Sequence, residues 1–282
     1  MIEIKGIGTE QFSSPNLNTA KPLDRAALAI RLTLLVLAVT TIYALLTINA
    51  NGIDMPKAIL DTLSTLRTIF FQPYSAHFTV WQGFWEIVIT LGLAFLTTLF
   101  GGVIALFLGL MAAQNLAPKW LTNVIKSVVA FIRAVPSILW VLIFAVAAGL
   151  GSTAAVIGLT FHSVAYLTKA YSESFEDLDR SVIEALMATG ANWWQVVFQA
   201  VIPSSATYLL SWTFLRFEIN FSNAVAMGAA AGAAGIGFDL FMASEFYFNL
   251  HEVGLVTYFI LAFAIILEVL ATNMKSRLMK QA

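Results

Sequence analysis

Residues 184–203 read EALMATGANWWQVVFQAVIP and lie between two long apolar stretches of the chain. Gly190 suits the position just after a helix, because a residue without a Cβ adopts positive φ at little cost. Asn192 can cap a second helix, and Pro203 is expected to end that helix before the next apolar stretch. With Asp179 near the start of the first helix, the pattern predicts two short helices joined at a corner.

The composition is that of a membrane protein. Of 282 residues, 59% are hydrophobic and 11% are charged, whereas a soluble domain carries about a quarter charged residues. The absence of cysteine excludes disulfides and thiolate chemistry. His77, His162 and His251 are too scattered to predict a metal site, and no pattern indicates a catalytic residue. The net charge of −1 gives no reason to expect a nucleic-acid partner.

Six stretches are long and apolar enough to cross the hydrocarbon core as helices. They are residues 26–48, 83–112, 122–148, 152–172, 204–230 and 252–273. Residues 119–133 carry three cations, so they either belong to the third span or lie along the membrane surface before the chain turns inward near Pro136. We therefore expect an all-α integral membrane protein with about six transmembrane helices.

The distribution of Lys and Arg predicts the orientation. One side has nine such residues: Lys5, Lys21, Arg25, Lys119, Lys169, Arg180, Lys275, Arg277 and Lys280. The long first loop on the other side has Lys57 and Arg67. By the positive-inside rule both termini are cytoplasmic.

The expected organisation has five parts: a cytoplasmic tail (1–25), a first span (26–48), an extracytoplasmic loop (49–82), a membrane core (83–276) and a second cytoplasmic tail (277–282). The core holds five spans and the cytoplasmic loop 173–203. Within the extracytoplasmic loop, AILDTLSTLRTIFF either forms an amphipathic helix on the outer surface or serves as an ordered connector, which is the simpler interpretation.

The second short helix of the cytoplasmic loop is expected to expose an apolar ridge. Its members are Trp193, Trp194, Val197 and Phe198. Such a ridge is costly in water unless a partner protein accepts it in a groove. The alternative is that the two tryptophans anchor the loop among lipid headgroups.

The spacing in this loop resembles the EAA loop of permease subunits of ATP-binding-cassette importers. That pattern has Glu-Ala-Ala, Gly at the seventh position and Pro at the twentieth. Here Glu184, Ala185, Gly190 and Pro203 match it, while Leu186, Ala200 and the pair Val201-Ile202 depart from it.

The resemblance implies a type I (MetI-like) importer permease fold. It also implies a coupling helix that docks on the ATPase subunit, with Glu184, Ala185, Gly190, Trp193 and Trp194 as its contacts. No G-x-x-x-x-G-K-[ST] motif is found. We therefore expect no cofactor in this chain, with ATP and Mg bound by a partner ATPase subunit.

Further segments resemble the phosphonate branch of these permeases, whose members carry YRFEINxR and GAGGIG. They are RAVPSILWVLIF (133–144), YSESFEDLDRSVIEALMATGA (171–191), LRFEINFSNA (215–224) and AGAAGIGFDL (231–240). Ser222 stands where relatives have Arg. The resemblance implies a prokaryotic plasma-membrane importer of phosphonate or a related oxyanion such as phosphite or phosphate. It also implies a homodimer with two ATPase subunits and an extracytoplasmic binding protein, working by alternating access.

The fifth span carries the densest set of polar residues. Arg216, Asn220 and Asn223 share one stripe of the helix, whereas Glu218 and Ser222 share another face. We expect the stripe to face the translocation pathway, with Ser222 as a further candidate. Glu218 is expected to pair with a cation on a neighbouring helix such as Arg133. The alternative is a buried ion-pair network that fixes helix packing.

The segment GAAAGAAGIG (228–237) follows this span. Its glycines predict either a close approach of helices or a bend at a gate. They are Gly228, Gly232, Gly235 and Gly237.

Two other functions remain open. A stand-alone ion-coupled carrier or channel would suit the intramembrane Arg216 and Glu218, but the chain has no evident internal duplication. A membrane-bound enzyme is poorly supported, because no ligand or catalytic cluster is present. A P-loop ATPase in a neighbouring reading frame would favour the importer.

Overall fold

The computed structural model describes residues 25–47 and 54–279, and every regular element among them is helical. This confirms the predicted all-α class. The chain divides into two units, one up to Ala58 and one from Ile59 onward. The predicted tail 1–25, except for Arg25, lies outside the described residues, as do residues 280–282.

The first unit contains α1 (Arg25–Thr47). Its Ala26–Thr47 segment is long and apolar enough to cross a membrane, and none of its apolar side chains is buried within the protein. A helix with no buried face suits surroundings of lipid or of another chain. The segment agrees with the first predicted span.

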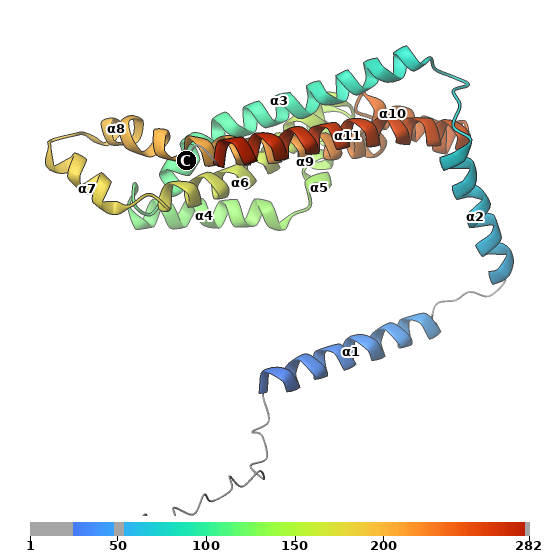
Figure 1. Cartoon of the computed structure of the whole chain (residues 1–282), viewed down its shortest axis with the longest axis horizontal. Coiled ribbons are helices and arrows are strands. Elements are labelled where there is room, and N and C mark those ends of the chain that lie inside the picture. The colour runs from blue at the N-terminus through green and yellow to red at the C-terminus, as the bar shows by residue number, and fades with distance from the viewer. Residues whose placement is uncertain (1–24, 48–53, 280–282) are drawn as a thin grey trace, which may run out of the picture. The chain divides into compact units, whose positions relative to one another are not determined.

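The second unit is a bundle of long helices joined by short ones (Figure 1). Its elements after α2 (Met55–Phe71), which begins in the first unit, are α3 (Val80–Ala112), α4 (Lys119–Ala134), α5 (Ser137–Ala148), α6 (Ser152–Glu176), α7 (Arg180–Ala188), α8 (Trp193–Val196), a π-helical turn (Val197–Val201), α9 (Ile202–Ala231), α10 (Ile236–Phe241), a second π-helical turn (Met242–Phe246) and α11 (Leu250–Met279). Helices α3, α6 and α9 pack against one another, and α11 packs on α3 and α9.

Helix α6 occupies the centre of this bundle. It contacts α3, α4, α5 and α9, and polar side chains such as Ser163 and Thr168 are buried on it. Among the described residues, three helices (α1, α3 and α11) have the length and hydropathy of a span, or five spans if each of two bent pairs counts as one. The predicted span 152–172 is not among them, because a helix surrounded by protein does not need an apolar surface.

The predicted third span is a bent pair of helices. Helices α4 and α5 meet at 91° across Val135 and Pro136, so the turn lies where Pro136 predicted it. The cationic segment packs lengthwise on α6: Lys126 reaches Glu176 at one end of the contact, and Ile132 packs near Ala165 toward the other. Residues 119–133 thus pack within the bundle, which favours the alternative that they belong to the third span.

The segment predicted as a connector in the first loop is helical. Helix α2 ends against the start of α11, where the Tyr258 hydroxyl donates to the Phe70 carbonyl at 2.6 Å. His251 Nδ1 lies 2.6 Å from the Gln72 carbonyl oxygen. The amphipathic-helix alternative is therefore the correct one for local structure.

The glycine-rich segment makes a close turn between α9 and α10. Gly232 ends α9 with φ 65°, and Gly235 has φ 113°. A Cβ on Gly228 would overlap with the backbone of Gly237 and Phe238. The helices on either side are bent by 49°, so both the predicted close approach and the predicted bend are present.

Candidate functional site

The loop between α6 and α9 has the predicted two helices and corner. Asp179 caps α7 by accepting from the Ser181 N–H at 2.9 Å, and hydrogen bonding with the Ser181 backbone and side chain lowers the pKa of Asp179. Gly190 has φ 87°, a conformation that costs other residues energy. Asn192 then caps α8 in a reciprocal pair with Gln195, at 2.9 and 2.7 Å. The corner is thus fixed by local backbone rules.

Pro203 does not end the second helix as predicted. The chain stays helical from Trp193 to Ala231, with a π-helical turn at Val197–Val201 before α9. Proline has no N–H to donate, and the first turn of a helix is where that donor is not needed. The wider turn before Pro203 lets α8 and α9 continue as one rod.

The predicted apolar ridge is divided between the interior and the surface. Val197 is fully buried, and the Trp193 indole N–H donates to the Leu116 carbonyl at 2.9 Å, which ties the loop to the α3–α4 connection. Trp194 and Phe198 are 53% and 62% exposed, with stacked rings 6.0 Å apart. The exposed ridge therefore consists of Trp194 and Phe198.

The first helix of the loop also presents a surface. Ile183 is buried and anchors α7 to the core, whereas Glu184 and Ala185 are exposed on it. We call the exposed residues Glu184, Ala185, Trp194 and Phe198 the loop surface. It comprises one carboxylate on α7 and two aromatic rings that follow the corner.

The polar stripe of α9 points into the protomer. Arg216 is 2% exposed, its Nε donates to Ser163 Oγ at 3.0 Å, and its guanidinium lies 4.9 Å from the centre of the Tyr166 ring. Asn220 donates to Thr98 Oγ1 at 2.9 Å and accepts from Ser163 Oγ at 3.1 Å. Arg216 Nη2 has no hydrogen-bond partner within the described part of the chain.

The assignment of the two faces of α9 is therefore wrong in the protomer. Arg216 and Asn220 do share a face, but α3 and α6 cover it. Glu218 instead lines a cavity of about 410 Å³ with Tyr208, Trp212 and Thr272. The predicted pair with Arg133 is not formed among residues 54–279. Helical periodicity places residues on a face but does not tell which neighbour covers that face.

The remaining members of the stripe lie nearer the surface. Asn223 is half-buried and Ser222 is exposed. Arg133, from the last turn of α4, is exposed and lies 6.0 Å from the same Tyr166 ring as Arg216. Two guanidinium groups thus flank one aromatic side chain of α6.

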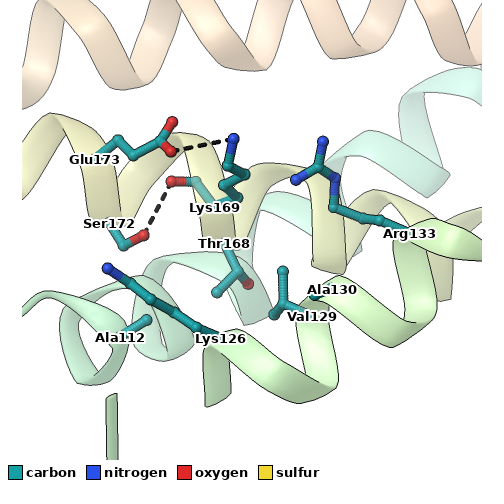
Figure 2. A pocket seen from close by; sticks show the side chains of 9 residues that line it. All are labelled: Ala112, Lys126, Val129, Ala130, Arg133, Thr168, Lys169, Ser172 and Glu173. Carbon is teal, nitrogen blue, oxygen red and sulfur yellow. Dashed lines mark hydrogen bonds and ion pairs between the residues drawn. The ribbon is translucent and has the colours of Figure 1, made fainter. Parts of the chain in front are cut away.

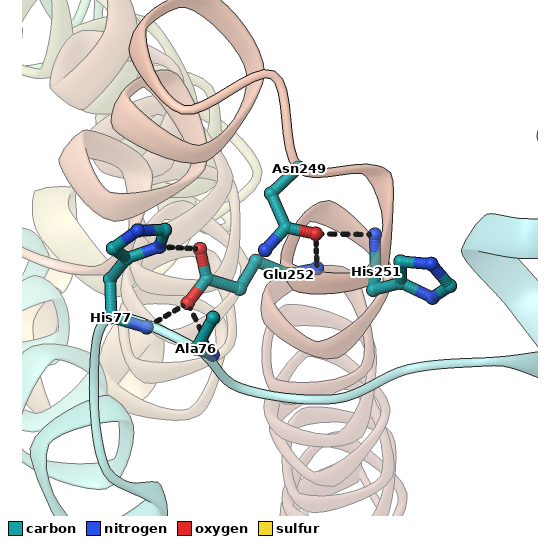
Figure 3. A network of polar contacts seen from close by, with 5 residues as sticks. All are labelled: Ala76, His77, Asn249, His251 and Glu252. Atoms are coloured by element: carbon teal, nitrogen blue, oxygen red, sulfur yellow. Dashed lines mark hydrogen bonds and ion pairs between the residues drawn. The ribbon is translucent and has the colours of Figure 1, made fainter.

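A cluster of polar contacts around Glu252, at the start of α11, was not predicted (Figure 3). Glu252 is 1% exposed and accepts from the Ala76 N–H at 2.7 Å and from the His77 N–H. His77 Nδ1 lies 2.7 Å from its second oxygen, and the His77 ring stacks on Tyr247 at 3.9 Å. The cluster fastens the α2–α3 connection to α11. Its only sequence signal is a carboxylate at the edge of an apolar stretch.

Comparison with known protein families matches residues 105–279 to the family described as "Binding-protein-dependent transport system inner membrane component". The phosphite transport system permease protein PtxC of Stutzerimonas stutzeri is 30% identical over 77% of this chain and 79% of its own length. The phosphate-import permease protein PhnE of Mycolicibacterium smegmatis is 28% identical over 67% of this chain, which is 35% of that protein.

Solved structures of transporters share the fold of this chain. A structure of the MetNI methionine ABC transporter, described as inward facing, matches with a TM-score of 0.62 at 21% identity. The match covers 72% of this chain and 99% of the other. A crystal structure of an amino acid ABC transporter with histidines matches with a TM-score of 0.57 at 17% identity.

Proposed function

Since the chain belongs to the family of binding-protein-dependent transport system inner membrane components, we propose that it is the membrane permease of an ATP-driven importer of phosphonate or a related phosphorus oxyanion. Its fold is that of MetI-type permeases. Relatives named for phosphite, phosphate and phosphonate transport support the substrate class.

The loop surface is the observation that carries this proposal. Gly190 makes the corner between two capped helices, and Glu184, Trp194 and Phe198 are exposed on this loop. Exposed aromatic rings on a loop are the kind of feature that another protein covers. In this proposal the cover is an ATPase subunit, which holds ATP and Mg, so that this chain itself catalyses nothing.

The proposed assembly has two copies of this chain, two ATPase subunits and an extracytoplasmic binding protein that delivers the oxyanion. The complex lies in the plasma membrane of a prokaryote with both termini of the permease in the cytoplasm, as the Lys and Arg distribution suggests. Closure of the ATPase subunits would be transmitted through the loop surface to α9, because α8 and α9 form one continuous rod. The pathway would then open alternately to the two sides.

The test is ATP hydrolysis by the reconstituted complex in the presence of the binding protein and methylphosphonate, phosphite or phosphate. Gly190→Leu strains a positive-φ position by about 1–2 kcal/mol and is expected to reduce substrate-stimulated hydrolysis several-fold. Glu184→Lys is expected to do the same by reversing a surface charge. Gly92→Ala is the matched control, because a Cβ there meets no neighbouring atom.

Two results would contradict the proposal. One is coupling in both loop variants equal to that of the wild type. The other is uptake of the oxyanion by the purified chain alone without ATP, which would favour an ion-coupled carrier.

A further inference from the structure

A basic pocket lies between α4 and α6, close to the end of α3 (Figure 2). It encloses about 150 Å³. Its polar lining consists of Lys126 and Arg133 from α4 and Thr168, Lys169, Ser172 and Glu173 from α6. Lys126 and Arg133 are seven residues apart, so they lie on the same face of α4.

Arg133 is the deepest cation of the basic pocket. Helix α4 begins at Lys119 and packs lengthwise on α6, so Arg133 in its last turn lies about 20 Å along the bundle. The hydrocarbon core of a bilayer is about 30 Å thick, and a guanidinium that faces lipid at such a depth is costly. Arg133 is nevertheless exposed on the protomer. It therefore faces water, another chain or an anion.

The cations of the basic pocket differ in their partners. Lys126 pairs with Glu176 at 2.8 Å, and Lys169 pairs with Glu173 at 3.2 Å. Arg133 has no ion pair or hydrogen bond within residues 54–279. Its guanidinium lies 6.0 Å from the centre of the Tyr166 ring, which is a cation–π contact. Since the Lys169–Glu173 pair is half-exposed, it contributes little stability and Lys169 can change partner.

Thr168 gives an independent indication of a ligand. It is 1% exposed, and its hydroxyl has no hydrogen-bond partner in the described part of the chain. Buried hydroxyls are nearly always paired. Figure 2 shows the Thr168 side chain facing α4 beside Val129, within the lining of the basic pocket. An acceptor atom in the pocket would satisfy this donor once side chains adjust.

We propose that the basic pocket binds a phosphate-type oxyanion, with Arg133 as its principal contact and Thr168 and Lys169 as further donors. Tetrahedral phosphorus oxyanions offer several acceptor oxygens, and a guanidinium can donate to two of them at once. The phosphate could belong to a free oxyanion or to the headgroup of an anionic lipid, since basic pockets between transmembrane helices also hold such headgroups. The binding site stands on the geometry alone, whereas its use as a resting place for imported cargo rests on the proposed function.

The test is equilibrium binding of radiolabelled inorganic phosphate to the assembled transporter in nanodiscs of phosphatidylcholine. Wild type is expected to bind saturably, and Arg133→Gln is expected to bind at least about tenfold more weakly, as for loss of a charged hydrogen bond. Arg67→Gln is the matched control, because Arg67 is an exposed arginine on α2. Arg133→Lys keeps the charge without the planar fork, so intermediate binding is expected even if the Gln variant assembles poorly.

A second arm separates the two sources of phosphate. In nanodiscs that contain phosphatidic acid, retention of this lipid by wild type but not by Arg133→Gln, with no binding of free phosphate, assigns the pocket to a headgroup. Equal binding by wild type and both Arg133 variants in both arms overturns the inference, even if the complex imports phosphonate. Arg133-dependent phosphate binding by a complex that transports no phosphorus oxyanion would leave the pocket in place and remove the proposed function.

Discussion

Glu252 and Arg216 are both charged and buried, and they differ in how their hydrogen-bonding capacity is used. Glu252 receives two backbone N–H groups and the His77 ring. Arg216 donates through Nε to Ser163 and lies over Tyr166, but its Nη2 is unpartnered and no carboxylate pairs with it among residues 54–279. A buried charge whose partners all lie in the chain stabilises the fold by holding two segments together. A buried charge with an unpartnered donor can still donate a hydrogen bond to another chain, to water or to a ligand.

Removing the Glu252 carboxylate should have the largest effect. Glu252→Ala removes the acceptor of the Ala76 and His77 N–H groups, and each donor that water cannot then reach costs about 1–3 kcal/mol. We expect a marked fall in the thermal unfolding temperature in detergent. Glu252→Gln keeps an acceptor oxygen and should lose less. Equal stability of Glu252→Ala and wild type would show that the contacts of Glu252 do not stabilise the fold.

Removing the Arg216 charge should have the opposite sign. Replacing a whole buried ion pair by apolar side chains of similar volume is often neutral or stabilises by about 1–4 kcal/mol, and removing Arg216 leaves no carboxylate unpaired among residues 54–279. Arg216→Met should therefore unfold at the same temperature as the wild type or a higher one. If Arg216→Met lowered the unfolding temperature as much as Glu252→Ala, Arg216 would also stabilise the fold, and the two buried charges would not differ in role.

The His77 side chain should contribute less than the carboxylate it meets. His77→Phe keeps a ring to stack on Tyr247 and removes only the Nδ1 contact, while the backbone donors of Ala76 and His77 remain. The expected loss is about 1 kcal/mol, as for one hydrogen bond. The same unfolding measurement, made for His77→Phe, Glu252→Gln and the double variant, gives their coupling. Additive losses in this cycle would argue against a direct interaction between the two side chains.

The local structure of the cytoplasmic loop could be predicted because capping depends on nearby residues. Asp179, Gly190 and Asn192 act within three residues of their partners. The same locality explains the turn at Pro136 and the end of α9 at Gly232. The prediction that Pro203 ends the helix was wrong because the preceding π-helical turn accommodates the proline. No local signal in the sequence distinguishes a helix that ends at Pro203 from one that continues through it.

The packing of the site could not be predicted because it depends on segments far apart in the chain. Trp193 and Trp194 are equivalent in sequence, yet one reaches the Leu116 carbonyl, 77 residues away, and the other is exposed. Glu252 meets His77 across 175 residues. Periodicity grouped Arg216 with Asn220 correctly, but only the positions of α3 and α6 decide that this face is internal.

An exposed charge pair gives the smallest expected effect and a reference for the two buried ones. Lys169 and Glu173 are one turn apart on α6 and about half-exposed, and such pairs contribute about 0.3–0.5 kcal/mol. Lys169→Gln should therefore leave the unfolding temperature almost unchanged. It should still weaken phosphate binding by a few-fold, because Lys169 shares the basic pocket with Arg133. The matched control is Lys57→Gln on α2, which should change neither quantity, since Lys57 is exposed outside the pocket. If Lys169→Gln lost as much stability as Glu252→Ala and still bound phosphate normally, the exposed pair would be structural. The contrast between charges that stabilise the fold and charges that are free to bind a ligand would then not hold for α6.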